Sequence, residues 1–178
     1  MSINSSKQPT LKPQDLLVAL KIAIHPDRLY TYAELATELS MSVSEVHAAA
    51  KRAEISRLLS RSNNELRAVR TSIQEFLVHG VKYAFPVING PLARGMATGF
   101  AGPALKELFV ATNELPPVWP DPEGEARGPA IQPIYSSVTT ASRIDQKLYS
   151  ILTLVDALRG GSAREREISE EKLMEYLL

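Results

Sequence analysis

The chain has 178 residues, of which 44% are hydrophobic and 22% charged, so it can bury one substantial core and is no disordered protein. Its 20 Lys and Arg residues balance 20 Asp and Glu residues, which excludes a histone-like polycation. It has no cysteine and no apolar run long enough for a bilayer, and its first seven residues lack the apolar stretch of a secretory signal. We therefore expect a cytoplasmic protein without disulfides, thiolate metal sites or a membrane association.

Charge is distributed unevenly along the chain. Residues 1–106 contain 13 basic and 8 acidic side chains, whereas residues 107–178 contain 7 basic and 12 acidic ones. Basic residues are densest between positions 44 and 70, and such a cluster is typical of a surface that binds a polyanion. The alternative is that these cations only solvate a long helix face.

The N-terminal part has helical patterns with clear start and stop signals. Residues 1–12 lack periodicity, so we expect them to form a flexible arm. Apolar residues at helical spacing predict a helix over residues 13–25, which ends at Pro26. Thr31 with Glu34, and Ser42 with Glu45, have the spacing of capping boxes. We expect two further helices, which begin near Tyr32 and near residue 43.

Residues 32–51 resemble a bacterial helix-turn-helix. Small Ala36 stands where the two helices touch, and apolar side chains occupy the packing positions on both sides of the turn. Ser40 is a departure, because the family favours glycine at that position of the turn. The resemblance implies that the helix after Ser42 reads double-stranded DNA in the major groove. Two amphipathic helices joined by a short turn in a protein that binds no DNA remain the alternative.

A wing is expected after this motif. The pattern of residues 65–79 predicts a fourth helix that ends at Gly80. Residues 81–88 and 94–100 have the pattern of β-strands, and the turn signal that begins at Asn89 lies between these two strands. A helix-turn-helix followed by a helix and a hairpin resembles a winged helix. Residues 89–103 contain several glycines, so a loop that binds a ligand or partner is the alternative. The candidate DNA contacts on the recognition helix, after it and in the expected wing are Ser42, Ser44, His47, Lys51, Arg52, Arg57, Lys82 and Arg94.

The acidic half predicts a connector followed by helices. Residues 115–124 are rich in proline and contain the single Trp119, which packs on the body or anchors a partner. Residues 146–159 have an amphipathic pattern that Gly160 ends, and Ser162 with Glu165 predicts the cap of a last helix. We expect this C-terminal helical hairpin to pack on the body, to form a homodimer or to bind a protein partner.

The sequence offers no catalytic motif. The histidines are far apart, and there is no zinc-binding pair, nucleophile turn or phosphate-binding loop, so we expect no enzyme, metal or cofactor. The predicted fold class is mainly α with a small β-hairpin. The predicted organisation is an arm (1–12), a winged helix-turn-helix domain (13–103), a connector (104–145) and a helical hairpin (146–178). We predict that the protein is a sequence-specific transcriptional regulator. The alternative is an adaptor or an antitoxin-like component that binds a protein partner through the winged helix and the acidic region.

Overall fold

A computed structural model describes residues 8–110 and 112–177. The chain begins with three helices, α1 (Pro13–Ala23), α2 (Tyr32–Leu39) and α3 (Val43–Ile55), and continues with the strands β1 (Leu59–Ser62) and β2 (Glu65–Ala68). The first three helices begin where the sequence predicts them. The arm expected over residues 1–12 lies partly outside the described residues, and residues 8–12 contain no helix or strand.

The middle of the chain forms short helices and a second sheet. Helices α4 (Arg70–His79) and α5 (Val81–Ala84) precede strand β3 (Asn89–Ala97), two 3₁₀ turns (Gly99–Ala101 and Lys106–Leu108), and strands β4 (Val118–Pro120) and β5 (Ala126–Ile131). The chain ends with α6 (Val138–Ile144), α7 (Gln146–Gly160) and α8 (Ala163–Leu177). The expected extended connector therefore contains two strands and a helix.

The fourth helix is present and ends before Gly80 as predicted, but its predicted start is wrong. It begins at Arg70 rather than at residue 65, because Asn63 and Asn64 both adopt positive φ angles and form a tight turn between β1 and β2, so Glu65–Ala68 is a strand. The hairpin expected over residues 81–100 is absent, since residues 81–84 are helical. The expected turn at Asn89 is instead the start of β3, which pairs with the distant strands β4 and β5.

The structure is mixed α/β, with one two-stranded and one three-stranded sheet. β1 and β2 are antiparallel, with Ser62 opposite Glu65. β3 is antiparallel to both β4 and β5, and a single parallel pair between Val118 and Ala130 closes the three strands into a small barrel. Gly95 makes this closure possible, because a Cβ atom there would lie 1.9 Å from the Trp119 carbonyl oxygen.

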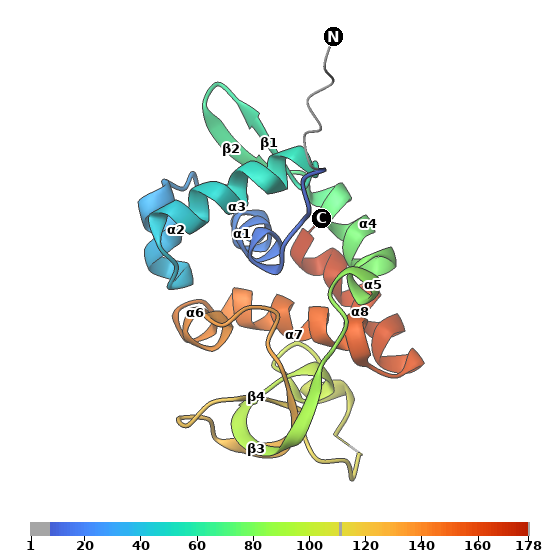
Figure 1. Cartoon of the computed structure of the whole chain (residues 1–178). Helices are drawn as coiled ribbons and strands as arrows, with labels where there is room; N and C mark the ends of the chain where they lie inside the picture. Colours follow the sequence, from blue (N-terminus) through green and yellow to red (C-terminus); the bar gives the residue numbers. More distant parts are fainter. Residues whose placement is uncertain (1–7, 111, 178) are drawn as a thin grey trace.

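Helices α1 and α7 occupy the centre of the molecule. α1 is buried from Asp15 to Ala23, and α7 is buried from residue 151 to 158. Their apolar side chains belong to one hydrophobic cluster that also includes Trp119. Figure 1 shows the β1–β2 hairpin at one end of the molecule and the β3–β5 barrel at the other, with the helices between them. Both ends are thus held by a common core.

Candidate nucleic-acid interface

The turn between α2 and α3 is held by backbone geometry and caps. Ser40 ends α2 in the left-handed conformation, at φ 52° and ψ 47°, and the amide of Met41 donates to the carbonyl of Ala36 at 2.9 Å. The side chain of Ser42 accepts from the amide of Glu45, and the Glu45 carboxylate accepts from the amide of Ser42. These bonds fix the direction in which α3 leaves the turn.

One face of α3 is buried and the opposite face is exposed to solvent. Val46, Ala49, Ala50 and Ala53 are fully buried. Ser44, His47 and Lys51 are exposed, and they follow each other at helical spacing on the outer side. The His47 ring lies edge-to-face with the Tyr32 ring, at 5.0 Å between centroids, which fixes its direction. Lys51 forms no ion pair within the part of the chain that the structure describes.

Arg52 points away from this outer face. Its Nε donates to Oδ2 of Asp15 at 2.9 Å and its Nη2 donates to Oδ1 at 2.6 Å. Asp15 is fully buried in α1, and its hydrogen bonds to the guanidinium raise the pKa of Arg52. Arg52 therefore anchors α3 to α1, and its charge is already compensated by a carboxylate.

Ser42 is likewise engaged within the protein. Its hydroxyl donates to Oε2 of Glu45 at 2.7 Å, and Tyr135 donates to the other oxygen of the same carboxylate at 2.8 Å. Hydrogen bonds from the Ser42 side chain, the Ser42 amide and Tyr135 lower the pKa of Glu45 to about 2. Ser42 thus positions the first turn of α3, while Glu45 keeps a negative charge at that end of the helix.

The β1–β2 hairpin continues the basic surface beside α3. Arg57 is exposed at the end of α3 and has a φ of 60°. Arg61 on β1 donates to Glu54 at 3.0 Å and to the Tyr32 hydroxyl at 2.7 Å, and Arg67 on β2 pairs with Glu65 at 3.0 Å. The Arg67–Glu65 pair is exposed and such pairs are weak, so the Arg67 guanidinium remains able to bind another anion, whereas Arg61 holds Glu54 through two hydrogen bonds.

Arg61 and Arg67 were not among the predicted contacts. The signal in the sequence is the Asn63–Asn64 pair, because asparagine tolerates the left-handed conformation that a tight hairpin turn requires. The same pair also suits a break between two helices, which is why the strands beside it are not predicted.

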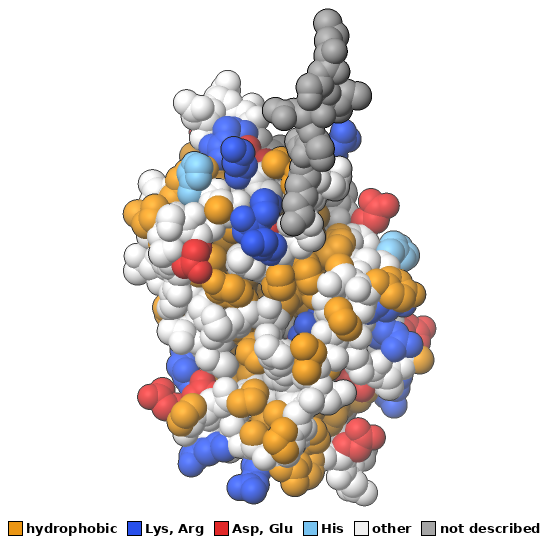
Figure 2. Space-filling view, viewed as in Figure 1, with side chains coloured by type: hydrophobic (Ala, Val, Ile, Leu, Met, Phe, Trp, Pro, Cys, Tyr) orange, Lys and Arg blue, Asp and Glu red, His pale blue; other side chains and the backbone are white. Residues whose placement is uncertain are grey.

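Lys82 and Arg94 are not brought to this surface. Lys82 belongs to α5 and its Nζ lies 5.0 Å from the centroid of the Tyr83 ring. Arg94 belongs to β3, and its Nε donates to the carbonyl of Gly124 at 2.6 Å. Figure 1 shows β3 at the end of the molecule opposite the β1–β2 hairpin. In the space-filling view, Lys and Arg side chains are visible at both ends (Figure 2).

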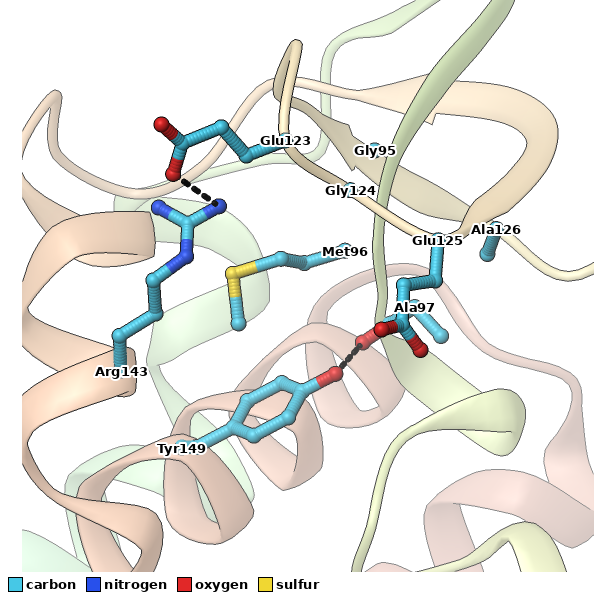
Figure 3. A pocket seen from close by; sticks show the side chains of 9 residues that line it. All are labelled: Gly95, Met96, Ala97, Glu123, Gly124, Glu125, Ala126, Arg143 and Tyr149. Carbon is cyan, nitrogen blue, oxygen red and sulfur yellow. Dashed lines mark hydrogen bonds and ion pairs between the residues drawn. The ribbon is translucent and has the colours of Figure 1, made fainter.

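A cavity of about 410 Å³ lies between the barrel and helices α6 and α7. Figure 3 shows Met96 between Arg143 on one side and Tyr149 on the other. Arg143 pairs with Asp121 at 2.6 Å and lies 3.8 Å from Glu123, and the Tyr149 hydroxyl donates to the carbonyl of Ala97 at 2.6 Å. Arg143 and Tyr149 thus have protein partners, and the carboxylates of Glu123 and Glu125 also line the cavity.

Residues 8–110 and 112–177 contain neither a metal-binding cluster nor a membrane-spanning helix. No group of three or more His, Asp or Glu side chains there is arranged to hold a metal ion, and no helix there is long and apolar enough to cross a membrane. Comparison with protein-family models, with curated proteins and with solved structures finds no match for this chain. The geometry of the molecule is therefore the basis for the function that follows.

Proposed function

We propose that the protein binds double-stranded DNA as a winged helix-turn-helix and acts as a sequence-specific transcriptional regulator in the cytoplasm. The observation that carries the proposal is the continuous exposed surface formed by the outer face of α3 and the adjoining β1–β2 hairpin. Three helices followed directly by a hairpin is the order typical of winged helices. β1–β2 thus replaces the hairpin expected at residues 81–100 as the wing.

In this proposal α3 enters the major groove. Ser44 and His47 face the base edges, and Lys51 and Arg57 contact phosphates. Arg61 and Arg67 lie on the wing, where Arg67 exchanges its exposed partner Glu65 for the DNA backbone and Arg61 stays paired with Glu54. Arg52 has a positioning role through its pair with buried Asp15. The proposal requires no metal or cofactor.

The test is binding of the full chain to a pool of genomic duplex fragments at two salt concentrations, with sequencing of the retained DNA. We expect enrichment of a defined site and a steep loss of affinity between about 50 and 200 mM salt. Lys51→Gln together with Arg57→Gln removes two phosphate contacts. The magnitude of the slope of the logarithm of the association constant against the logarithm of the salt concentration therefore decreases by about 1.8. His47→Ala changes the preferred sequence, since it removes a base contact rather than a phosphate contact.

Lys106→Gln together with Lys147→Gln is the matched control, because both lysines are exposed and lie outside the proposed interface. Equal effects of the two double variants would contradict the placement of the interface. Retention of no duplex at low salt would favour the adaptor hypothesis instead. The exposed glutamates of α8 are the feature that supports this second function, since they offer a surface for a protein partner.

A further inference from the structure

Two arginines face each other on the outer side of the small barrel. Arg94 on β3 and Arg127 on β5 are opposite residues in the antiparallel ladder, and both are exposed. The next pair on the same face is Leu92 with Pro129, and the Leu92 side chain is 57% exposed. Opposite residues in a sheet point to the same side, so these four side chains form one surface, which we call the arginine face.

The arginine face has no anionic partner within the described residues. Arg94 donates only to the carbonyl of Gly124, and Arg127 forms no ion pair there. By contrast, Arg143 and Arg159, which are near in the fold, pair with Asp121 and Asp156 at 2.6 Å. Like charges directly opposite in a sheet are destabilising, so this arrangement indicates a surface that an anionic group completes.

A surface of opposite charge lies on α8. Glu167, Glu170, Glu171 and Met174 recur at positions i, i+3, i+4 and i+7, so they share one exposed side of the helix, which we call the acidic face. None of these glutamates forms an ion pair within the described residues, where Lys172 pairs with Glu175 instead. Met174 is 50% exposed and supplies an apolar side chain at the C-terminal end of this face.

The two faces cannot meet within one molecule. Figure 1 shows β3 at one end of the molecule, whereas α8 begins beside the 3₁₀ turn Gly99–Ala101 and runs from there along α7 toward α4. We propose that the arginine face of one molecule binds the acidic face of a second copy of this chain. Arg94 and Arg127 then pair with Glu170 and Glu171.

The apolar side chains of the two faces fit the same contact. Leu92 lies two residues from Arg94, and Met174 lies three residues from Glu171, so Leu92 packs on Met174 beside the charged pairs. The two faces differ, so the contact is heterologous and forms a ring or a chain of molecules rather than a two-fold dimer. The arginine face and the proposed DNA interface lie at opposite ends of the molecule, so the contact does not use the residues proposed to bind DNA (Figure 1).

Sedimentation velocity of the full chain without DNA tests this proposal. We expect the sedimentation coefficient to rise with protein concentration at about 50 mM salt and to rise less at about 300 mM, because salt screens the charged contacts. Arg94→Glu with Arg127→Glu weakens self-association at least about tenfold, and Glu170→Lys with Glu171→Lys does the same. A mixture of these two double variants associates again, since each supplies the charge that the other lacks.

The control for charge is Lys106→Glu with Lys147→Glu, which changes net charge as the arginine variant does and leaves self-association unchanged. Circular dichroism shows that each variant is folded before it is used. A wild-type chain that stays monomeric at low salt overturns the proposal, as does a mixture of the two charge-reversed variants that fails to associate.

Discussion

The most completely buried cation of the described residues is Lys21, which connects three helices. Its side chain is only 1% exposed, and its Nζ lies 2.6 Å from Glu38 on α2 and 2.6 Å from Asp145, the N-cap of α7. His25 lies 2.7 Å from the same oxygen of Asp145. Removing one partner of such a group leaves a buried charge uncompensated, so each member fixes the position of the others.

Asp145 makes stability depend on pH at the acid end. Burial raises the pKa of Asp145, but hydrogen bonds from Lys21, His25 and the Leu148 amide outweigh it and lower the pKa to about 2. The folded-state pKa lies below the unfolded one, so the carboxylate stabilises the fold above about pH 4 and loses this effect as pH falls toward 2. We expect Asp145→Asn to lower the free energy of unfolding by about 2 kcal/mol at pH 7, with the difference closing toward pH 2.

Urea unfolding of wild type and variant at pH 7, 5 and 3 measures this difference. Asp27→Asn is the control, since Asp27 is exposed and has no ion pair within the described part of the chain. A gap between wild type and Asp145→Asn that stays constant from pH 7 to pH 3 would contradict the assignment of the charge effect to Asp145.

At the scale of elements, the α2–α3 turn contains a serine in a backbone conformation that suits glycine. Ser40 has a φ of 52°, and a residue with a Cβ atom pays about 1–2 kcal/mol for that region. Ser40 is exposed, so no packing is lost when its side chain is removed. The turn between α2 and α3 is therefore formed in spite of this residue, through the caps of the two helices and the packing of their buried faces.

Ser40→Gly is accordingly expected to stabilise the protein by about 1 kcal/mol, which raises Tm by roughly 2–4 °C for a chain of this size. Ser56→Gly is the matched control. Ser56 follows the end of α3 with a φ of −81°, a conformation without backbone strain that glycine could remove. Calorimetry of the two variants decides between the outcomes. Similar changes in Tm for both would show that backbone strain at Ser40 is not the cause.

At the scale of the whole molecule, one core joins the N-terminal helices to the C-terminal ones. Leu20 of α1, Ile151 of α7 and Trp119 of β4 belong to the same hydrophobic cluster. Trp119 is buried, and its Nε1 donates to Asp156 of α7 at 2.6 Å. The division into residues 13–103 and 146–178 remains a prediction, and the shared core gives a way to test it.

Unfolding followed by Trp119 fluorescence and by far-ultraviolet circular dichroism is expected to give coincident transitions, because the single tryptophan reports on the barrel and the dichroism on the helices. Leu20→Ala, at a fully buried position, lowers both midpoints together, with a cost of about 2–5 kcal/mol. If the variant shifts the dichroism and leaves the fluorescence midpoint in place, the two parts unfold independently.

The sequence by itself determined the features that depend on neighbouring residues. The capping pairs Thr31 with Glu34 and Ser42 with Glu45 lie three positions apart, so they predict the starts of α2 and α3 correctly. The exposed positions of Ser44, His47 and Lys51 on α3 follow from helical periodicity for the same reason.

Only the tertiary structure decided which distant residues meet. Arg52 pairs with Asp15, 37 residues earlier, and Arg94 lies opposite Arg127 across a sheet whose strands are far apart in the chain. The position of the β1–β2 hairpin was not predicted from the sequence either, because Asn63 and Asn64 are compatible with a helix break as well as with a tight turn. Strand pairing and ion pairing depend on which surfaces the core brings together, and local propensity carries no information on that choice.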